Sequence, residues 1–191
     1  LHLSLRRQRQ MCIRDSVQPI FIIEGKNKKI PITSMPGVYR YSIDKLNSFV
    51  KKIIDLGIPM IALFPYTERR LKDNHASEAL NENNLVCKAT KLIKKKFGNK
   101  IGIMCDVALD PYTSHGHDGI LKSNKILNDK TIDILIQQSI IQAKAGCDVI
   151  APSDMMDGRI GKIRKALDKN NFSNVRILSY AVKYLSLIHI S

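Results

Sequence analysis

Residues 106–119 read DVALDPYTSHGHDG, and this stretch decides the expected fold and the position of the site. It places three carboxylates and two histidines around one turn at the end of an apolar run. Acidic groups at the end of a buried strand lie at the rim of a sheet, where α/β enzymes carry out their chemistry. The stretch therefore predicts a strand that ends in a functional turn.

The residues of this strand are expected to alternate between two faces. With the two-residue period of a strand, Asp106, Ala108 and Asp110 share one face, and Cys105 and Val107 share the other. The first face then lines a cavity with two carboxylates and one small residue. The alternatives are an ion pair of Asp106 with a buried arginine and a turn cap at Asp110. The histidines and the third aspartate that follow favour a functional face.

Strand-like and helix-like segments alternate along the rest of the chain. Four apolar core strands are expected at 59–65, 101–108, 148–152 and 175–184, preceded by a short strand or an extended lead-in at 19–25. Helices are expected at 43–56, 81–97, 131–145 and 160–167. Gly57, Gly98 and Gly146 are expected helix stops, and Asp129 an N-cap. This order predicts a parallel sheet wrapped by helices, either doubly wound or a TIM barrel. No GxGxxG follows a strand and polar groups gather after the strand ends, so a TIM barrel is favoured.

The two ends of the chain differ in character from its middle. Residues 6–16 (RRQRQMCIRDS) and 185–191 (LSLIHIS) back-translate into one sequencing-library adapter, the second as its reverse complement. We therefore interpret 1–16 and 185–191 as adapter-derived artefacts. Residues 17–184 are then the natural chain, with half of the strands of an eight-stranded barrel. A basic targeting peptide is the alternative for the start, but it leaves the C-terminus unexplained.

The composition is basic, with a formal net charge of +14. Residues 1–16 contribute four arginines and one aspartate, which leaves +11 for the rest. The lysines are dispersed and tryptophan is absent, so a solvated basic face is favoured over a nucleic-acid partner. Cys87, Cys105 and Cys147 lack CxxC spacing, which indicates reduced, buried thiols in a cytoplasmic protein. No apolar run reaches the roughly 20 residues of a membrane span, so no membrane partner is expected.

Three segments together resemble the porphobilinogen synthase family, also called 5-aminolevulinate dehydratase. They are 106–119, 151–161 (APSDMMDGRIG) and 176–184 (RILSYAVKY), and 34–40 (SMPGVYR) also matches. The resemblance implies a hydro-lyase of tetrapyrrole (haem) biosynthesis. Such an enzyme condenses two 5-aminolevulinate molecules into porphobilinogen with loss of two waters. The resemblance also implies the first, N-terminal half of a TIM (β/α)8 barrel, a homo-octameric parent enzyme and an inactive 191-residue polypeptide.

Lys183 is the expected nucleophile. Ser179, Ala181 and Lys183 are expected on one face of a strand. The small side chains of the first two would form the floor of a pocket, and the Lys183 amine would project from it. A lysine at a strand end among apolar and aromatic neighbours can lose its proton and attack a ketone. The alternative is a surface lysine at a strand terminus. In the family, the lysine of this motif is one of two Schiff-base lysines, and the resemblance gives Asp106 the role of orienting or deprotonating an amine.

The segment 151–161 is expected to combine a pocket residue with local structure. Ser153 directly follows a strand and is expected to hydrogen-bond the amine or carboxylate of the substrate. Asp157 is expected to cap the next helix, and Met155 and Met156 to fill the core.

The metal ligands of the family fall on the turn 106–119. Zinc-using members have cysteines where this chain has Ala108, Asp110 and Asp118. Carboxylates are hard ligands, so the chain resembles the branch without a three-cysteine zinc site, which is associated with magnesium or monovalent cations. Asp110 and Asp118 are the expected metal ligands, and hydrogen bonding to the substrate amine is the alternative. The histidines of the turn are expected as ligands or as hydrogen-bonding loop residues.

Two other classes of function compete. A class I aldolase-type TIM barrel also uses a Schiff-base lysine on a strand, but it does not require the aspartate-rich turn. A basic RNA-binding module would show binding that depends sharply on salt. The aspartate-rich turn favours the first function over both.

Overall fold

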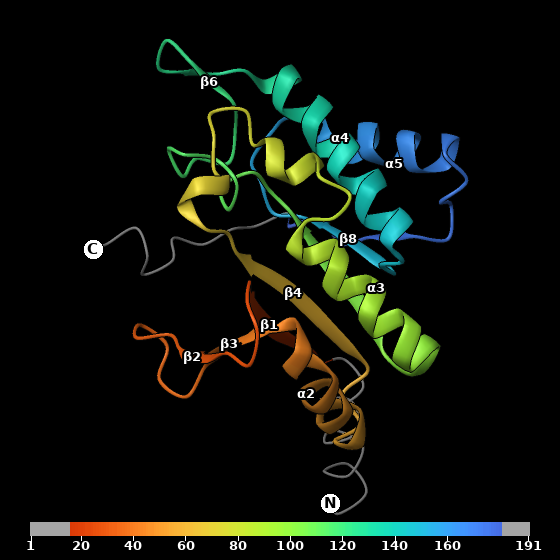
Figure 1. Cartoon of the computed structure of the whole chain (residues 1–191). Coiled ribbons are helices and arrows are strands. Elements are labelled where there is room, and N and C mark those ends of the chain that lie inside the picture. The colour runs from red at the N-terminus through yellow and green to blue at the C-terminus, as the bar shows by residue number, and fades with distance from the viewer. Residues whose placement is uncertain (1–15, 181–191) are drawn as a thin grey trace, which may run out of the picture.

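A seven-stranded sheet forms the centre of the computed structural model, which describes residues 16–180 (Figure 1). Its strand order is β2-β3-β1-β4-β5-β8-β9. The strands are β1 (Val17–Ile23), β2 (Lys29–Pro31), β3 (Tyr39–Ser42), β4 (Met60–Tyr66), β5 (Gly102–Val107), β8 (Val149–Pro152) and β9 (Arg176–Ile177). All neighbours are parallel except β2 and β3. The predicted parallel sheet is confirmed, and β1 belongs to it along its whole length.

The helices that connect these strands lie along one side of the sheet (Figure 1). They are α2 (Ile43–Asp55), α3 (Leu85–Phe97), α4 (Asn128–Ala145) and α5 (Arg159–Lys169). Gly57, Gly98 and Gly146 follow the first three with φ of 78°, 55° and 102°, which glycine adopts without strain. The expected helix stops are therefore confirmed. Within residues 16–180, no helix is long and apolar enough to cross a membrane.

Shorter elements fill the connections. The 3-10 helices are η1 (Arg69–Leu71), η2 (Ser77–Leu80) and η3 (Gly98–Lys100), and the hairpin strands are β6 (Leu121–Lys122) and β7 (Lys125–Ile126). The hairpin leads from the turn 106–119 into α4. Neither the hairpin nor the β2–β3 pair was expected from the sequence, because strands of two to four residues carry almost no periodic signal.

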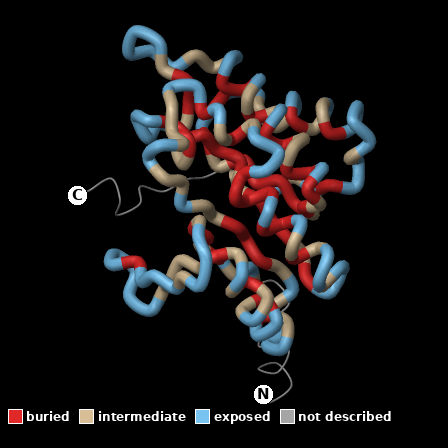
Figure 2. The backbone as a smooth tube through the Cα atoms, viewed as in Figure 1, coloured by how far each residue is buried: buried red, intermediate tan, exposed pale blue. Residues whose placement is uncertain are grey.

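The two faces of the sheet carry different cores, and the buried backbone is concentrated in the central strands (Figure 2). Ile61, Leu63, Ile103, Cys105, Val107 and Ile150 belong to the large core shared with the helices. The opposite face, called the inner face below, carries a smaller cluster of Ala62, Met104, Val149 and Ala151 with Met60, Phe64 and Tyr180. Strand alternation continues the inner face from Met104 to Asp106. The expected separation of Asp106 from Cys105 follows from this alternation.

Several local predictions are wrong. Strand β5 ends at Val107, so its alternation does not extend to Ala108 and Asp110. Helix α5 begins after Gly158, whose φ is 78°, and Asp157 therefore precedes the cap position. Helix α4 already begins at Asn128, which places Asp129 inside the first turn instead of at the cap. Met155 is 62% exposed, whereas Met156 is buried as expected.

Candidate active site

The carboxyl ends of β5, β8 and β9 lie next to one another at the C-terminal end of the parallel sheet. Strands β5 and β8 pair in parallel as far as Val107 and Pro152. The Ser153 N–H donates to the Val107 carbonyl at 3.2 Å, and the Tyr180 N–H donates to the Pro152 carbonyl at 3.3 Å. Burial raises the pKa of the Tyr180 phenol, and the nearby charge of Asp106 raises it further. The structure therefore brings together the ends of the strands that carry Asp106, Ser153 and Tyr180.

Two buried glutamines of α4 hold the end of β5. The Gln142 Nε2 donates to the Asp106 carbonyl at 2.9 Å, and the Gln138 Nε2 donates to the Ala108 carbonyl at 3.3 Å. Both side chains are 1% exposed. The sequence analysis missed them, although two glutamines four residues apart lie on the same face of a helix, which is a usable signal. Their hydrogen bonds satisfy buried carbonyls just where the ladder of the strand ends.

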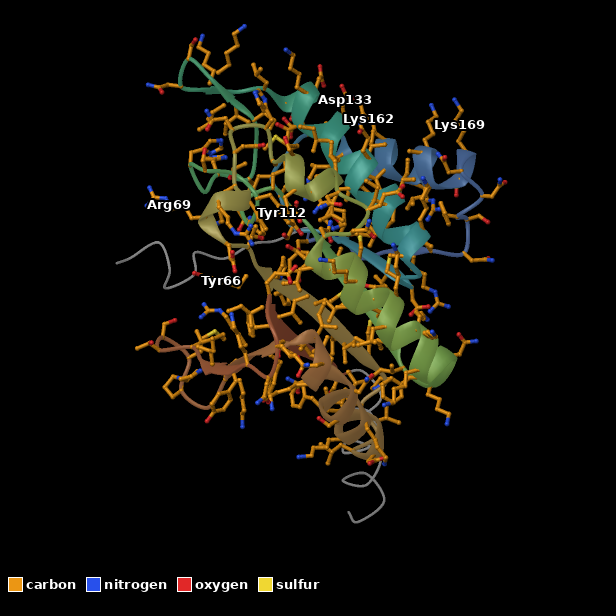
Figure 3. The ribbon with its side chains drawn as sticks, viewed as in Figure 1. Tyr66, Arg69, Tyr112, Asp133, Lys162 and Lys169 are labelled. Carbon is orange, nitrogen blue, oxygen red and sulfur yellow. The ribbon has the colours of Figure 1, made fainter. Side chains whose placement is uncertain are left out.

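The turn 106–119 is braced from the inside. Tyr112 is 3% exposed and lies close to the 3-10 helices η1 and η2 (Figure 3). The Asp73 N–H donates to the Tyr112 carbonyl at 3.2 Å, and the Ser114 N–H donates back to the Asp73 carbonyl at 3.0 Å. The Thr113 hydroxyl donates to the His117 carbonyl at 2.9 Å. Since burial raises the pKa of Tyr112 well above its usual value, its phenol is neutral and serves as core.

The two histidines of the turn bind its own backbone. The His117 N–H donates to Nδ1 of His115, and the Gly119 N–H donates to Nδ1 of His117, both at 3.1 Å. Burial lowers the pKa of His115, and the neighbouring His117 lowers it further. These contacts agree with the hydrogen-bonding alternative, because the Nδ1 lone pairs accept hydrogen bonds from backbone N–H groups of the turn.

The end of the turn lies beside the loop after β8. Burial raises the pKa of Asp154, and the charge of Asp118 raises it further, whereas the Arg159 guanidinium lowers it. Asp154 is completely buried and its Oδ2 accepts the Met156 N–H at 2.8 Å. The sequence analysis did not single out Asp154, because an aspartate in a loop gives no local sign of burial.

The described residues alone do not form a metal centre. Within residues 16–180, no group of three or more His, Cys, Asp or Glu side chains is placed to hold a metal ion. Asp110 and Asp118 both lie in the turn 106–119, and in the described part of the chain neither belongs to such a group of three. Lys183 and Ala181 lie outside the described residues, and Tyr180, three positions before Lys183, is the last residue described.

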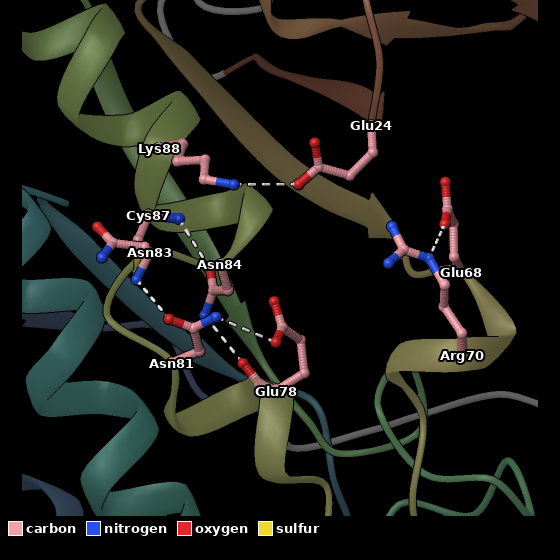
Figure 4. A network of polar contacts seen from close by, with 9 residues as sticks. All are labelled: Glu24, Glu68, Arg70, Glu78, Asn81, Asn83, Asn84, Cys87 and Lys88. Carbon is pink, nitrogen blue, oxygen red and sulfur yellow. Dashed lines mark hydrogen bonds and ion pairs between the residues drawn. The ribbon is translucent and has the colours of Figure 1, made fainter.

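A second polar network lies at the same end of the sheet, after β1 and β4 (Figure 4). Lys88 Nζ lies 3.3 Å from a Glu24 carboxylate oxygen, and Arg70 Nε lies 2.7 Å from a Glu68 oxygen. These side chains border a wide hollow of about 440 Å³. Both pairs are partly exposed to solvent, so they contribute little to stability. Asn84 closes the network as the N-cap of α3, with its side chain accepting a first-turn N–H at 2.9 Å.

A parallel sheet with helices along one side and polar side chains at the carboxyl ends of its strands is the arrangement found in part of an α/β barrel. The family model described as Delta-aminolevulinic acid dehydratase matches residues 2–189. The chain belongs to this family, whose other name is porphobilinogen synthase.

Relatives of known identity agree with this family. The delta-aminolevulinic acid dehydratase of Bradyrhizobium diazoefficiens is 51% identical over 183 residues, which cover 96% of this chain and 52% of the relative. The chloroplastic enzyme of Chlamydomonas reinhardtii is 46% identical over 172 residues, 89% of this chain and 44% of the relative. The chain spans about half the length of the curated relatives it matches.

A solved structure has the same fold. The crystal structure of the enzyme from Toxoplasma gondii, in complex with the reaction product porphobilinogen, matches with a TM-score of 0.87 and 39% identity. The match covers 95% of this chain and 53% of that one. The predicted fold class is therefore confirmed, and the chain forms about half of a TIM barrel.

Proposed function

We propose that the protein containing this chain is a porphobilinogen synthase. It condenses two molecules of 5-aminolevulinate into one porphobilinogen and releases two waters. Family membership supports the proposal, and so does the length of the match to enzymes of that name. In this proposal, residues 17–184 are the N-terminal half of the catalytic domain.

The observation that carries the proposal is the convergence of three strand ends on the inner face. Asp106 and Ser153 lie at adjacent strand ends, and the field of Asp106 reaches Tyr180. Tyr180 stands three residues before Lys183 in the sequence. A lysine nucleophile that follows Tyr180 in the chain, with a carboxylate and a hydroxyl at neighbouring strand ends, supplies the groups that imine chemistry at a ketone requires.

Lys183 is the proposed nucleophile. Its neutral amine adds to the ketone carbon of one 5-aminolevulinate, and the ketone oxygen leaves as water when the C=N bond forms. The resulting iminium withdraws electrons, which makes loss of a neighbouring proton and formation of the carbon–carbon bond easier. Asp106 orients or deprotonates an amine beside this centre, and the Ser153 hydroxyl binds the substrate. An aldolase-type barrel would not need the aspartate-rich turn, which favours the synthase.

Asp110 and Asp118 are the proposed cation ligands. Two carboxylates suit magnesium or a monovalent cation, and none of the three positions that hold thiolates in zinc-using members is a cysteine here. A cation there would offset negative charge near the substrate. The proximity of Asp118 to the buried Asp154 supports a local negative field that favours a cation or a protonated amine.

A homo-octameric, cytoplasmic protein that binds neither nucleic acid nor membranes is also part of the proposal. Several lysines are paired with carboxylates, which leaves less free positive charge for phosphate. These pairs are Lys88–Glu24, Lys94–Asp148, Lys144–Glu82 and Lys162–Asp129. Sedimentation of the full-length protein, with and without RNA, tests the oligomer and the absence of this partner.

Borohydride reduction tests the nucleophile. The full-length protein is incubated with 5-aminolevulinate and borohydride, and the labelled peptide is mapped by mass spectrometry. We expect the label on Lys183 or on a second Schiff-base lysine, with turnover abolished in Lys183→Ala. Lys169→Ala is the matched control, because Lys169 is an exposed lysine at the end of α5 (Figure 3). Unchanged labelling together with retained turnover in Lys183→Ala would contradict the proposal.

A further inference from the structure

A buried ion pair next to the candidate site joins the loop after β8 to the first turn of α5. Arg159 Nε lies 3.0 Å from Asp154 Oδ1, with 14% of the arginine side chain and none of the aspartate side chain exposed. Among the described residues, neither of these two atoms has a hydrogen-bond partner. The electrostatic attraction between them therefore compensates their removal from water. A charge left in this position without its partner would be strongly unfavourable, so the two side chains stay together.

The same guanidinium reaches two further chain segments. Arg159 Nη1 donates to the Met156 carbonyl at 3.0 Å, and Nη2 approaches the Tyr180 carbonyl at 3.5 Å. The Asp154 carboxylate in turn accepts the Met156 N–H at 2.8 Å. One side chain thus links the first turn of α5, the loop after β8 and the chain after β9. An ammonium group cannot reproduce these contacts, because they use three nitrogens of a planar group at once.

Both linked segments lead directly to residues of the proposed site. Ser153 precedes Asp154, and Lys183 follows Tyr180 by three positions. We propose that Arg159 is a positioning residue that holds the loop of Ser153 in register with the chain at Tyr180, from which Lys183 follows. This inference rests on the proposed function. A displacement of about 1 Å at a reacting group can reduce rate by on the order of 100-fold, so such a tether affects chemistry more than substrate binding.

Arg164 provides a matched control on the same helix. Its Nη1 donates to the Val175 carbonyl at 2.6 Å, and its Nη2 donates to the Phe172 carbonyl at 3.0 Å. It also pairs with Asp168 at 2.6 Å. Arg164 therefore anchors backbone carbonyls as Arg159 does, but it does so at the start of β9, away from the proposed site.

The test compares Arg159→Lys, Arg164→Lys and Asp154→Asn in the full-length protein. For each variant, the folded fraction is isolated by size exclusion, and its thermal midpoint, kcat, KM and rate of borohydride trapping with 5-aminolevulinate are measured. We expect Arg159→Lys and Asp154→Asn to trap the substrate about 10- to 100-fold more slowly, with kcat falling by a larger factor than KM rises. Arg164→Lys should lower the thermal midpoint but trap at the wild-type rate.

Three outcomes would overturn the inference. Wild-type trapping in both Arg159→Lys and Asp154→Asn would show that the tether does not position the nucleophile. Equal slowing in Arg159→Lys and Arg164→Lys, in proportion to lost stability, would show a purely structural role. In both cases the wild-type protein still traps 5-aminolevulinate, so the proposed function stands. Absence of trapping in the wild type would instead refute the proposed function, and this inference with it.

Discussion

Gly119 sits where the aspartate-rich turn passes closest to its surroundings, and replacing it by alanine tests how tightly the turn is packed. A Cβ at this position would lie 2.6 Å from Ile126 Cγ2 and 3.2 Å from Thr131 Oγ1. Gly119 is not among the glycines with positive φ, so its backbone accepts alanine. The cost of the substitution is therefore steric alone.

The size of the effect follows from these contacts. Ordinary van der Waals contact begins at 3.4 Å, so the Ile126 methyl must retreat by most of an ångström. Overpacking of this kind costs about 1–3 kcal/mol. Thr131 resists movement because its hydroxyl accepts the Ile120 N–H at 3.0 Å and donates to the Leu127 carbonyl at 2.8 Å. Loosening one of these bonds adds about 1 kcal/mol.

Thermal unfolding of the full-length protein measures this prediction. Gly119→Ala should lower the midpoint, by roughly 2–4 °C for each kcal/mol in a domain of this size. Ile126→Ala in the same background should recover most of the loss, since it removes the closest methyl from a side chain that is 41% exposed. Gly161→Ala is the control, because nothing lies within 4 Å of its Cβ position. An unchanged midpoint in Gly119→Ala, or no recovery in the double variant, would refute the reasoning.

Three further predictions concern the metal, a thiol and the present chain. Zinc-specific chelation should leave porphobilinogen synthesis intact while magnesium or potassium raises it; tight stoichiometric zinc whose removal abolishes activity would contradict this. Burial raises the pKa of the Cys87 thiol to about 12, from an ordinary value of 9.0, so stability should fall as pH rises from 9 towards 12. Alkylation of Cys87 at pH 9 should accordingly be slow until urea is added, and equal native and unfolded rates would disprove its protection. The 191-residue polypeptide should aggregate or pack loosely and make no porphobilinogen, because the sheet of the described residues ends at β2 and β9 without closing into a barrel; a cooperatively unfolding, active 191-mer would overturn this expectation.

The parts of the site predictable from sequence are those set by local periodicity. Asp106 is expected on the face opposite Cys105 because successive strand residues alternate, and the core clusters follow that alternation. Glycines end the helices at the expected positions because they adopt positive φ. Local geometry alone decides both features.

The parts that sequence could not supply depend on contacts between distant segments. Gln142 binds the carbonyl of Asp106 across 36 positions of chain, and Arg159 approaches that of Tyr180 across 21. The residues that neighbour each of these side chains in the sequence do not indicate which backbone group the side chain will contact. The expected cap at Asp157 is wrong for a related reason, because the left-handed Gly158 redirects the chain before α5 begins.

The strand order has a consequence for synthesis of the protein. Each of β3, β4, β5, β8 and β9 pairs with at least one strand that precedes it in the chain. A nascent polypeptide leaving the ribosome can therefore extend the sheet one strand at a time, and none of these strands waits for a later one to give it a first neighbour. With such sequential pairing, each new strand closes only the short loop that connects it to a strand already in place, and a short loop has a low entropic cost of closure. Strand β9 is the last of these strands to be added. The residues that follow it, which include the proposed nucleophile Lys183, leave the ribosome immediately afterwards.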